Sequence, residues 1–173
     1  MSSLRRITTE YSEQEDRIKL AGLTNNSQTV NLWFTMRLMS RLIIHCLSLL
    51  ERNTPELEKT PTTSQQSRKT IQNFVQKSAE QQITEEKAVK VSADAPTHLV
   101  IEIDVKQTEN GVSLIFKGES QSVYDIFFNR EQLRQWLGML HAIWGKTGWQ
   151  TQIWPDWMAN DHNQPNSEEK SVH

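Results

Sequence analysis

Hydrophobic and polar residues alternate in three short stretches near the N-terminus, and a stretch with helical spacing follows them. Side chains at every second position share one face of a β-strand, so the alternation predicts strands over 5–11, 18–20 and 30–34. From Thr35 onwards, apolar residues recur at the three- and four-residue spacing of an amphipathic helix, and threonine is a favoured helix N-cap. The first part of the chain therefore predicts three antiparallel strands and a helix over 36–51.

The same order of patterns returns in the second half of the chain. Alternating stretches begin at Leu99, Val112 and Tyr124, and a helical apolar stripe runs from Leu133 to Trp144. Consecutive strands joined by short polar turns form an antiparallel meander. We therefore predict an α+β fold of two pseudo-repeated βββα units, each an antiparallel meander plus a helix, with a connecting amphipathic helix between them.

The segment between the two predicted units has a different composition. Residues 53–65 are rich in Thr, Pro and Ser and predict a loop. After this loop, a weak apolar stripe that includes Ile71, Phe74 and Val75 predicts an amphipathic helix over about 66–88, which we expect to dock through that stripe.

These patterns divide the chain into five parts. The parts are the first βββα unit (1–52), the loop and connecting helix (53–97), the second βββα unit (98–148), an aromatic C-terminal segment (149–158) and a disordered tail (159–173). The tail is assigned because the chain after Met158 shows no hydrophobic periodicity.

The helices of the two units differ in how much of their surface is apolar. Helix 36–51 adds Leu38, Leu47 and Leu49 to its stripe, which then covers about half of the helix surface, whereas the stripe of the second helix covers about a third. A helix that is apolar over half of its surface needs cover on more than one side. We therefore expect helix 36–51 to lie centrally, against the second unit, the connecting helix or a second subunit.

Charge and composition narrow the classes of function. The chain has 19 Lys and Arg against 21 Asp and Glu, so no overall positive field attracts it to nucleic acid or anionic lipid. The longest apolar run, 42–50, is too short to span a bilayer, and the N-terminus lacks the apolar segment of a signal peptide. A single cysteine cannot form an internal disulfide, which agrees with a reducing compartment. We expect a cytoplasmic protein that contacts no membrane.

Each candidate for a catalytic or metal-binding residue has a simpler structural explanation. Cys46 falls in the apolar stripe of helix 36–51, and His45 points about 100° away from it, so the two cannot hold one metal together. His98, Glu102 and Asp104 alternate with apolar residues and are expected to share the solvated outer face of one strand. Motifs for a serine nucleophile, a phosphate-binding glycine loop or a C-x-x-C pair are absent from the sequence. We therefore predict no catalytic residue, no cofactor and no metal site.

Two pairs of arginines lie one helical turn apart, Arg37 with Arg41 and Arg130 with Arg134. Basic rows of this kind can bind phosphates. Acidic neighbours dilute both rows and the chain is not basic overall, so we interpret them as solvated helix faces.

Five of the six tryptophans follow residue 135, and three of these lie beyond the second predicted helix. Trp149, Trp154 and Trp157 either fold back to cap the core or present an aromatic surface to a partner. The predicted partner-binding residues are Trp149, Trp154, Trp157, Leu38, Leu47 and Leu49.

Together these features predict a non-catalytic protein-interaction or assembly module, an accessory protein that self-associates as a homodimer and has a protein partner of unknown identity. One alternative is a small-ligand-binding protein or enzyme with a cleft between the two units. A second alternative is a weak nucleic-acid binder that uses the arginine rows.

Overall fold

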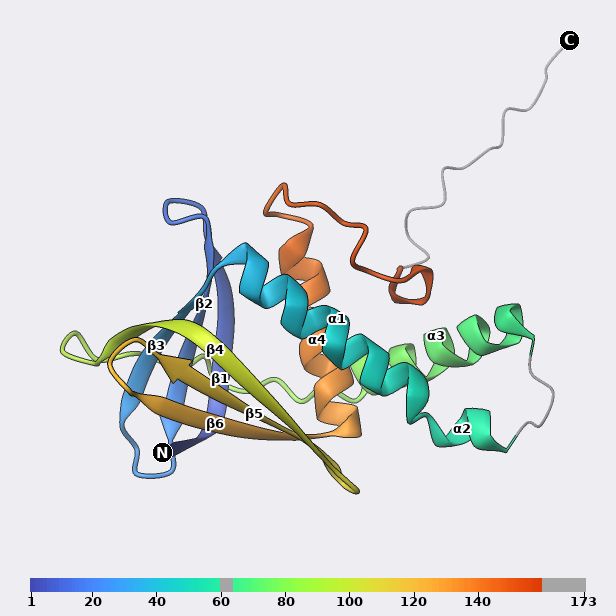
Figure 1. The fold of residues 1–173 in the computed structure, drawn as a ribbon, viewed down its shortest axis with the longest axis horizontal. Coiled ribbons are helices and arrows are strands. Elements are labelled where there is room, and N and C mark those ends of the chain that lie inside the picture. Colours follow the sequence, from blue (N-terminus) through green and yellow to red (C-terminus); the bar gives the residue numbers. More distant parts are fainter. Residues whose placement is uncertain (60–63, 160–173) are drawn as a thin grey trace, which may run out of the picture.

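The computed structural model describes residues 1–59 and 64–159, and at its centre six strands form a closed barrel (Figure 1). The strands are β1 (Ser2–Ser12), β2 (Arg17–Thr24), β3 (Thr29–Phe34), β4 (Thr97–Thr108), β5 (Gly111–Gly118) and β6 (Val123–Asn129). The helices are α1 (Met36–Arg52), α2 (Pro55–Glu58), α3 (Gln65–Gln81), α4 (Arg130–Trp144) and the short 3₁₀ helix η1 (Asp156–Met158). Within the described ranges, none of these helices is long and apolar enough to cross a membrane.

Two short parallel ladders close the barrel. The strands β1, β2 and β3 pair antiparallel in chain order, and so do β4, β5 and β6. Residues 31–33 of β3 then pair with residues 97–99 of β4, and residues 2–3 of β1 pair with residues 124–125 of β6. Each of these ladders occupies backbone groups that an open three-stranded sheet would leave unpaired at its edge.

The predicted fold class is therefore wrong. Instead of two pseudo-repeated βββα units with a connecting amphipathic helix, the strands form one closed six-stranded barrel, and no repeat of separate units is evident. An alternation of period two shows which face of a strand is buried, but it does not show which strands pair over long distances in the chain. The two ladders that close the barrel involve only a few residues, so they leave no separate pattern in the sequence.

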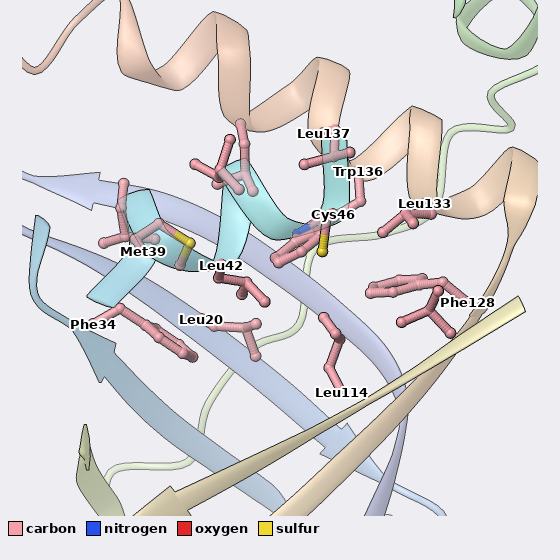
Figure 2. Packing of buried hydrophobic residues seen from close by; sticks show 14 of the residues in the cluster. Leu20, Phe34, Met39, Leu42, Cys46, Leu114, Phe128, Leu133, Trp136 and Leu137 are labelled. Atoms are coloured by element: carbon pink, nitrogen blue, oxygen red, sulfur yellow. The ribbon is translucent and has the colours of Figure 1, made fainter. Parts of the chain in front are cut away.

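The helices α1 and α4 cover the interior of the barrel. Figure 2 shows Met39, Leu42 and Cys46 of α1 pointing toward the strand residues Leu20 and Leu114. The helix α4 adds the buried residues Leu133, Trp136 and Leu137. Because α1 contacts β2, β4 and α4, it is covered on more than one side, which accounts for its broad apolar surface.

The connecting helix α3 docks through the face that the sequence analysis expected to be solvated. It buries Gln72, Gln76 and Ala79, whereas Phe74 from the predicted apolar stripe is 72% exposed. The helix also ends at Gln81, earlier than predicted. The stripe is weak, and the buried glutamines are held by hydrogen bonds, so polar contacts decide how this helix packs.

The hydrogen bonds that hold α3 converge on Arg134 of α4, which is only 4% exposed. Its Nη2 group donates to Gln72 Oε1 (2.7 Å) and to Thr54 Oγ1 (3.1 Å), and its Nη1 group donates to Gln76 Oε1 (3.4 Å). Burial lowers the pKa of Arg134 to about 10, an effect that the charge of Glu56 opposes. The guanidinium is still protonated at neutral pH. It links α4 to α3 and to Thr54, which follows the C-terminal end of α1. The prediction that Arg134 lies on a solvated face is therefore wrong.

We expect Arg134→Ala to lower the free energy of unfolding by about 3 kcal/mol, because it removes three charge-assisted hydrogen bonds and leaves buried amide oxygens without a donor. The exposed Arg130 lies one turn earlier on α4, and Arg130→Ala, the matched control, should change stability by less than about 0.5 kcal/mol. Denaturant unfolding measures both values. Equal effects of the two substitutions would contradict the role given to Arg134.

Cys46 lies in the centre of the core, as predicted, and burial raises the pKa of its thiol to about 12. The thiolate is the reactive form, so the folded protein should react with iodoacetamide at neutral pH only when it opens. We expect alkylation of Cys46 to be slow in buffer and complete within minutes in denaturant, as mass spectrometry can follow. Rapid alkylation under native conditions would show that α1 does not pack as described.

Candidate functional site

The strand β4 is much longer than its neighbour β3, and this difference leaves part of β4 unpaired on one edge. The ladder between the two strands ends at Leu99, and β3 ends at Phe34. Thr35 then caps α1, because its side chain accepts a hydrogen bond from the Leu38 N–H (3.3 Å). From this point to Thr108, β4 pairs with β5 alone among the described strands.

The helix α1 lies opposite this free edge, and the space between them is a groove of about 680 Å³. Its strand wall consists of the six consecutive residues 101–106. Because consecutive side chains of a strand point to opposite faces, a wall made of six successive residues is the edge of the strand itself. Its helix wall is Leu38, Arg41, Leu42 and His45. We call this hollow the α1–β4 groove.

The floor of the α1–β4 groove is apolar and its helix rim is basic. Ile103 and Val105 pack against the core together with Leu38, whereas Arg41 and His45 are exposed. No salt bridge joins Arg41 to a carboxylate in the part of the chain that the structure describes. The strand wall also carries Glu102, Asp104 and Lys106, so the groove combines an apolar floor with side chains of both charges.

The acidic residues of β4 are paired within the barrel. Lys117 Nζ of β5 lies 2.6 Å from Glu102 Oε1 and 2.8 Å from Asp104 Oδ2. A hydrogen bond from Lys117 lowers the pKa of Asp104, and hydrogen bonds to Asp104 and Glu102 raise the pKa of Lys117. Glu102 is exposed, and Asp104 and Lys117 are partly exposed, so this cluster affects the local charge of the groove more than it affects stability.

A β-bulge in β4 separates residues that the sequence analysis expected on one face. The register shifts between Val100 and Glu102, which reverses the facing of every residue after Ile101. His98 therefore lies beside Tyr124, with its Nε2 3.5 Å from the Tyr124 hydroxyl, while Glu102 and Asp104 bind Lys117. The expectation that His98, Glu102 and Asp104 share one outer face is wrong.

The aromatic C-terminal segment folds back onto the chain. Trp154 (9% exposed) and Trp157 (4% exposed) are buried, and Trp149 is partly buried. The Trp157 Nε1 group donates to Glu51 Oε1 (3.0 Å), and the Arg134 guanidinium lies 5.6 Å from the Trp157 ring centroid.

Trp149 and Trp154 pack against the end of α4. Both rings contact Trp144, with centroids 4.8 and 5.9 Å away, and the Trp149 Nε1 group donates to Asp16 Oδ1 (2.8 Å). The His141 ring lies 4.9 Å from Trp154, and burial lowers the pKa of His141, an effect that Glu80 opposes. These contacts account for the burial of the segment, while partner binding by its tryptophans stays a prediction.

The three predicted leucines of α1 lie in different environments. Leu47 and Leu49 are buried in the core, and Leu38 lines the α1–β4 groove. Of the predicted partner-binding residues, only Leu38 belongs to this groove.

Sequence reasoning missed the strand wall of the groove. The signal that could have revealed it is a difference in length, because β4 has 12 residues and its parallel neighbour β3 has six. The six residues of β3 cannot cover the whole edge of β4, but that inference needs the β3–β4 pairing, which the sequence does not show.

The described ranges contain no group of three or more His, Cys, Asp or Glu residues arranged to hold a metal ion. Comparison of the chain with protein-family models, with curated proteins and with solved structures found no match.

The C-terminal segment makes a testable contribution to stability. We expect Trp157→Ala to lower the free energy of unfolding by about 3 kcal/mol, because it opens a cavity and removes the partner of Glu51. Trp149→Ala should cost less, since its ring is partly exposed. Denaturant unfolding monitored by circular dichroism measures both. A Trp157→Ala protein as stable as the unmodified chain would show that the segment is not part of the core.

Proposed function

We propose that this protein is a non-catalytic protein-interaction module that binds a polypeptide in the α1–β4 groove. The observation that carries the proposal is the unpaired edge of β4 beside an apolar floor. Exposed main-chain N–H and C=O groups on a strand edge pair readily with another strand. The proposal develops the expectation of an interaction module and moves its site from the tryptophans to the groove.

The rest of the fold supports a polypeptide as the ligand of this groove. Between Glu102 and Thr108 the ladder to β5 is regular, so the free edge presents evenly spaced main-chain groups along its length. A small molecule would satisfy few of these groups, whereas an extended chain satisfies them in sequence. This difference favours a polypeptide over the small ligand that the sequence left open.

The proposal also includes a cellular location and a form of self-association. A cytoplasmic location is supported by the single cysteine, which is unpaired and buried. A homodimer is one form that binding in the groove could take, with a second copy as the polypeptide. The experiment below separates a second copy from another protein.

Photo-crosslinking tests the proposal directly. Ile101, which lines the groove and is 57% exposed, is replaced by the crosslinking residue p-benzoylphenylalanine. The control carries the same replacement at Phe127, which is 47% exposed on β6. In an extract of the organism that makes the protein, we expect polypeptide adducts at position 101 and few at position 127. Purified protein alone reports self-association as an adduct of twice the chain mass.

A second substitution links the adducts to the groove. Leu38→Trp fills the helix wall and should remove most adducts at position 101, whereas Ile44→Trp, on an exposed part of α1 outside the groove, should leave them unchanged. Mass spectrometry identifies the crosslinked peptide and the contacted residue. Adducts that form equally at both positions, or that persist in Leu38→Trp, would refute the proposed function.

A further inference from the structure

We propose that the occupant of the α1–β4 groove is the β4 strand of a second copy of this chain, paired antiparallel about a twofold axis at Val105. Such an interface is isologous, because each copy places its strand in the groove of the other. This inference rests on the proposed function and names the partner. It depends on the part of β4 that is free and regular, and on the order of the charged residues along it.

The regular part of the free edge has Val105 at its midpoint. The strand β3 pairs with β4 only as far as Leu99. The regular ladder between β4 and β5 begins at Glu102, after the bulge, and continues to Thr108, where β4 ends. An antiparallel pair with Val105 opposite Val105 therefore uses residues 102–108 of both copies in full. Any other register leaves part of this edge unpaired at each end.

The charges along β4 select the same register. Glu102, Asp104 and Lys106 alternate with Ile103 and Val105. With the axis at Val105, Asp104 of each copy lies opposite Lys106 of the other copy, so two pairs of opposite charge form. An axis one residue earlier places Asp104 opposite Asp104, and an axis one residue later places Lys106 opposite Lys106. Like charges directly opposite each other destabilise a strand pair.

The outer face of the paired strands carries balanced charge. In each copy, Lys117 binds both Glu102 and Asp104, whereas Lys106 forms no salt bridge within the described ranges. These four side chains comprise two carboxylates and two ammonium groups. Two copies can therefore bring these faces together without net repulsion, and Lys106 is left to pair with the Asp104 carboxylate of the other copy.

A second copy also supplies apolar side chains for the floor of the groove. Ile103 and Val105 pack against the core side of β4. A twofold axis perpendicular to the sheet keeps the same side chains on the same face in both copies. The entering strand therefore directs its own Ile103 and Val105 to the side on which Leu38 and Leu42 line the groove. Their burial favours association by removing apolar surface from water.

Disulfide formation tests the position of the axis. Directly opposite residues of an antiparallel pair have Cα atoms about 4.5 or 5.5 Å apart, a separation that a disulfide can span. We expect Val105→Cys to form a covalent dimer under mild oxidation. Asp104→Cys and Lys106→Cys should react at least about tenfold more slowly, because each lies diagonal to its own copy. Cys46 stays in every variant, since it is buried.

Charge reversal tests the two cross-strand pairs. Lys106→Asp sets carboxylates opposite each other, and Asp104→Lys does the same with ammonium groups. Each variant alone should therefore raise the dissociation constant of the dimer at least about tenfold. A mixture of the two variants restores both pairs of opposite charge, so it should form heterodimers with close to the original affinity. Sedimentation velocity with one variant fluorescently labelled measures all three constants.

The matched control for these variants is Lys87→Asp. Lys87 is exposed and lies outside the groove, so the same change of side chain there should leave the dimer unchanged. Circular dichroism confirms that every variant is folded.

The outcomes separate the failure of this inference from the failure of the proposed function. A strict monomer at high concentration, equally fast disulfide formation at positions 104, 105 and 106, or a mixture that does not restore dimers overturns the inference. In each of these cases, crosslinks from position 101 to another protein would leave the proposed function standing. Absence of groove-specific crosslinks to any polypeptide, a second copy included, overturns the proposed function itself.

Discussion

The short parallel ladder between β3 and β4 is the contact on which the rest of the structure depends. It joins residues 31–33 to residues 97–99 and so connects the N-terminal strands to the C-terminal strands. Because β3 ends soon afterwards, the chain turns into α1 directly above the barrel, and β4 continues alone. The same three residue pairs therefore help to close the barrel, position α1 over its interior and leave the free edge that forms the α1–β4 groove.

Two different kinds of contact hold the helices in this arrangement. Apolar packing holds α1 and α4 on the barrel, with Phe128 stacked on Trp136 at a centroid distance of 5.2 Å. Hydrogen bonds to the buried Arg134 hold α3 and the end of α1, and Trp157 covers that guanidinium. Because the C-terminal aromatic residues pack in this way, none of Trp149, Trp154 and Trp157 lines the α1–β4 groove.

The sequence was sufficient for local structure and insufficient for long-range pairing. The N-cap at Thr35 and the burial of Cys46 follow from residue type and spacing. The closed barrel could not be predicted from the sequence, because hydrophobic and polar residues alternate in the same way in an open sheet and in a closed one. The sequence did not predict that α3 is rotated about its axis either, because hydrogen bonds to Gln72 and Gln76 outweigh a weak apolar stripe. For the groove, the sequence supplied Leu38 but not the strand opposite it.

The central claim is that β4 has a free edge beyond Leu99 in the monomer, and amide hydrogen exchange tests it most directly when NMR measures it on the Lys106→Asp variant, whose β4 edges should not pair with each other. In an antiparallel ladder, alternate residues direct their N–H groups to the neighbouring strand. We predict that between residues 102 and 107 slowly exchanging amides, bonded to β5, alternate with amides that exchange rapidly with water. Uniformly slow exchange over these residues would show that the edge is already paired and would contradict the account.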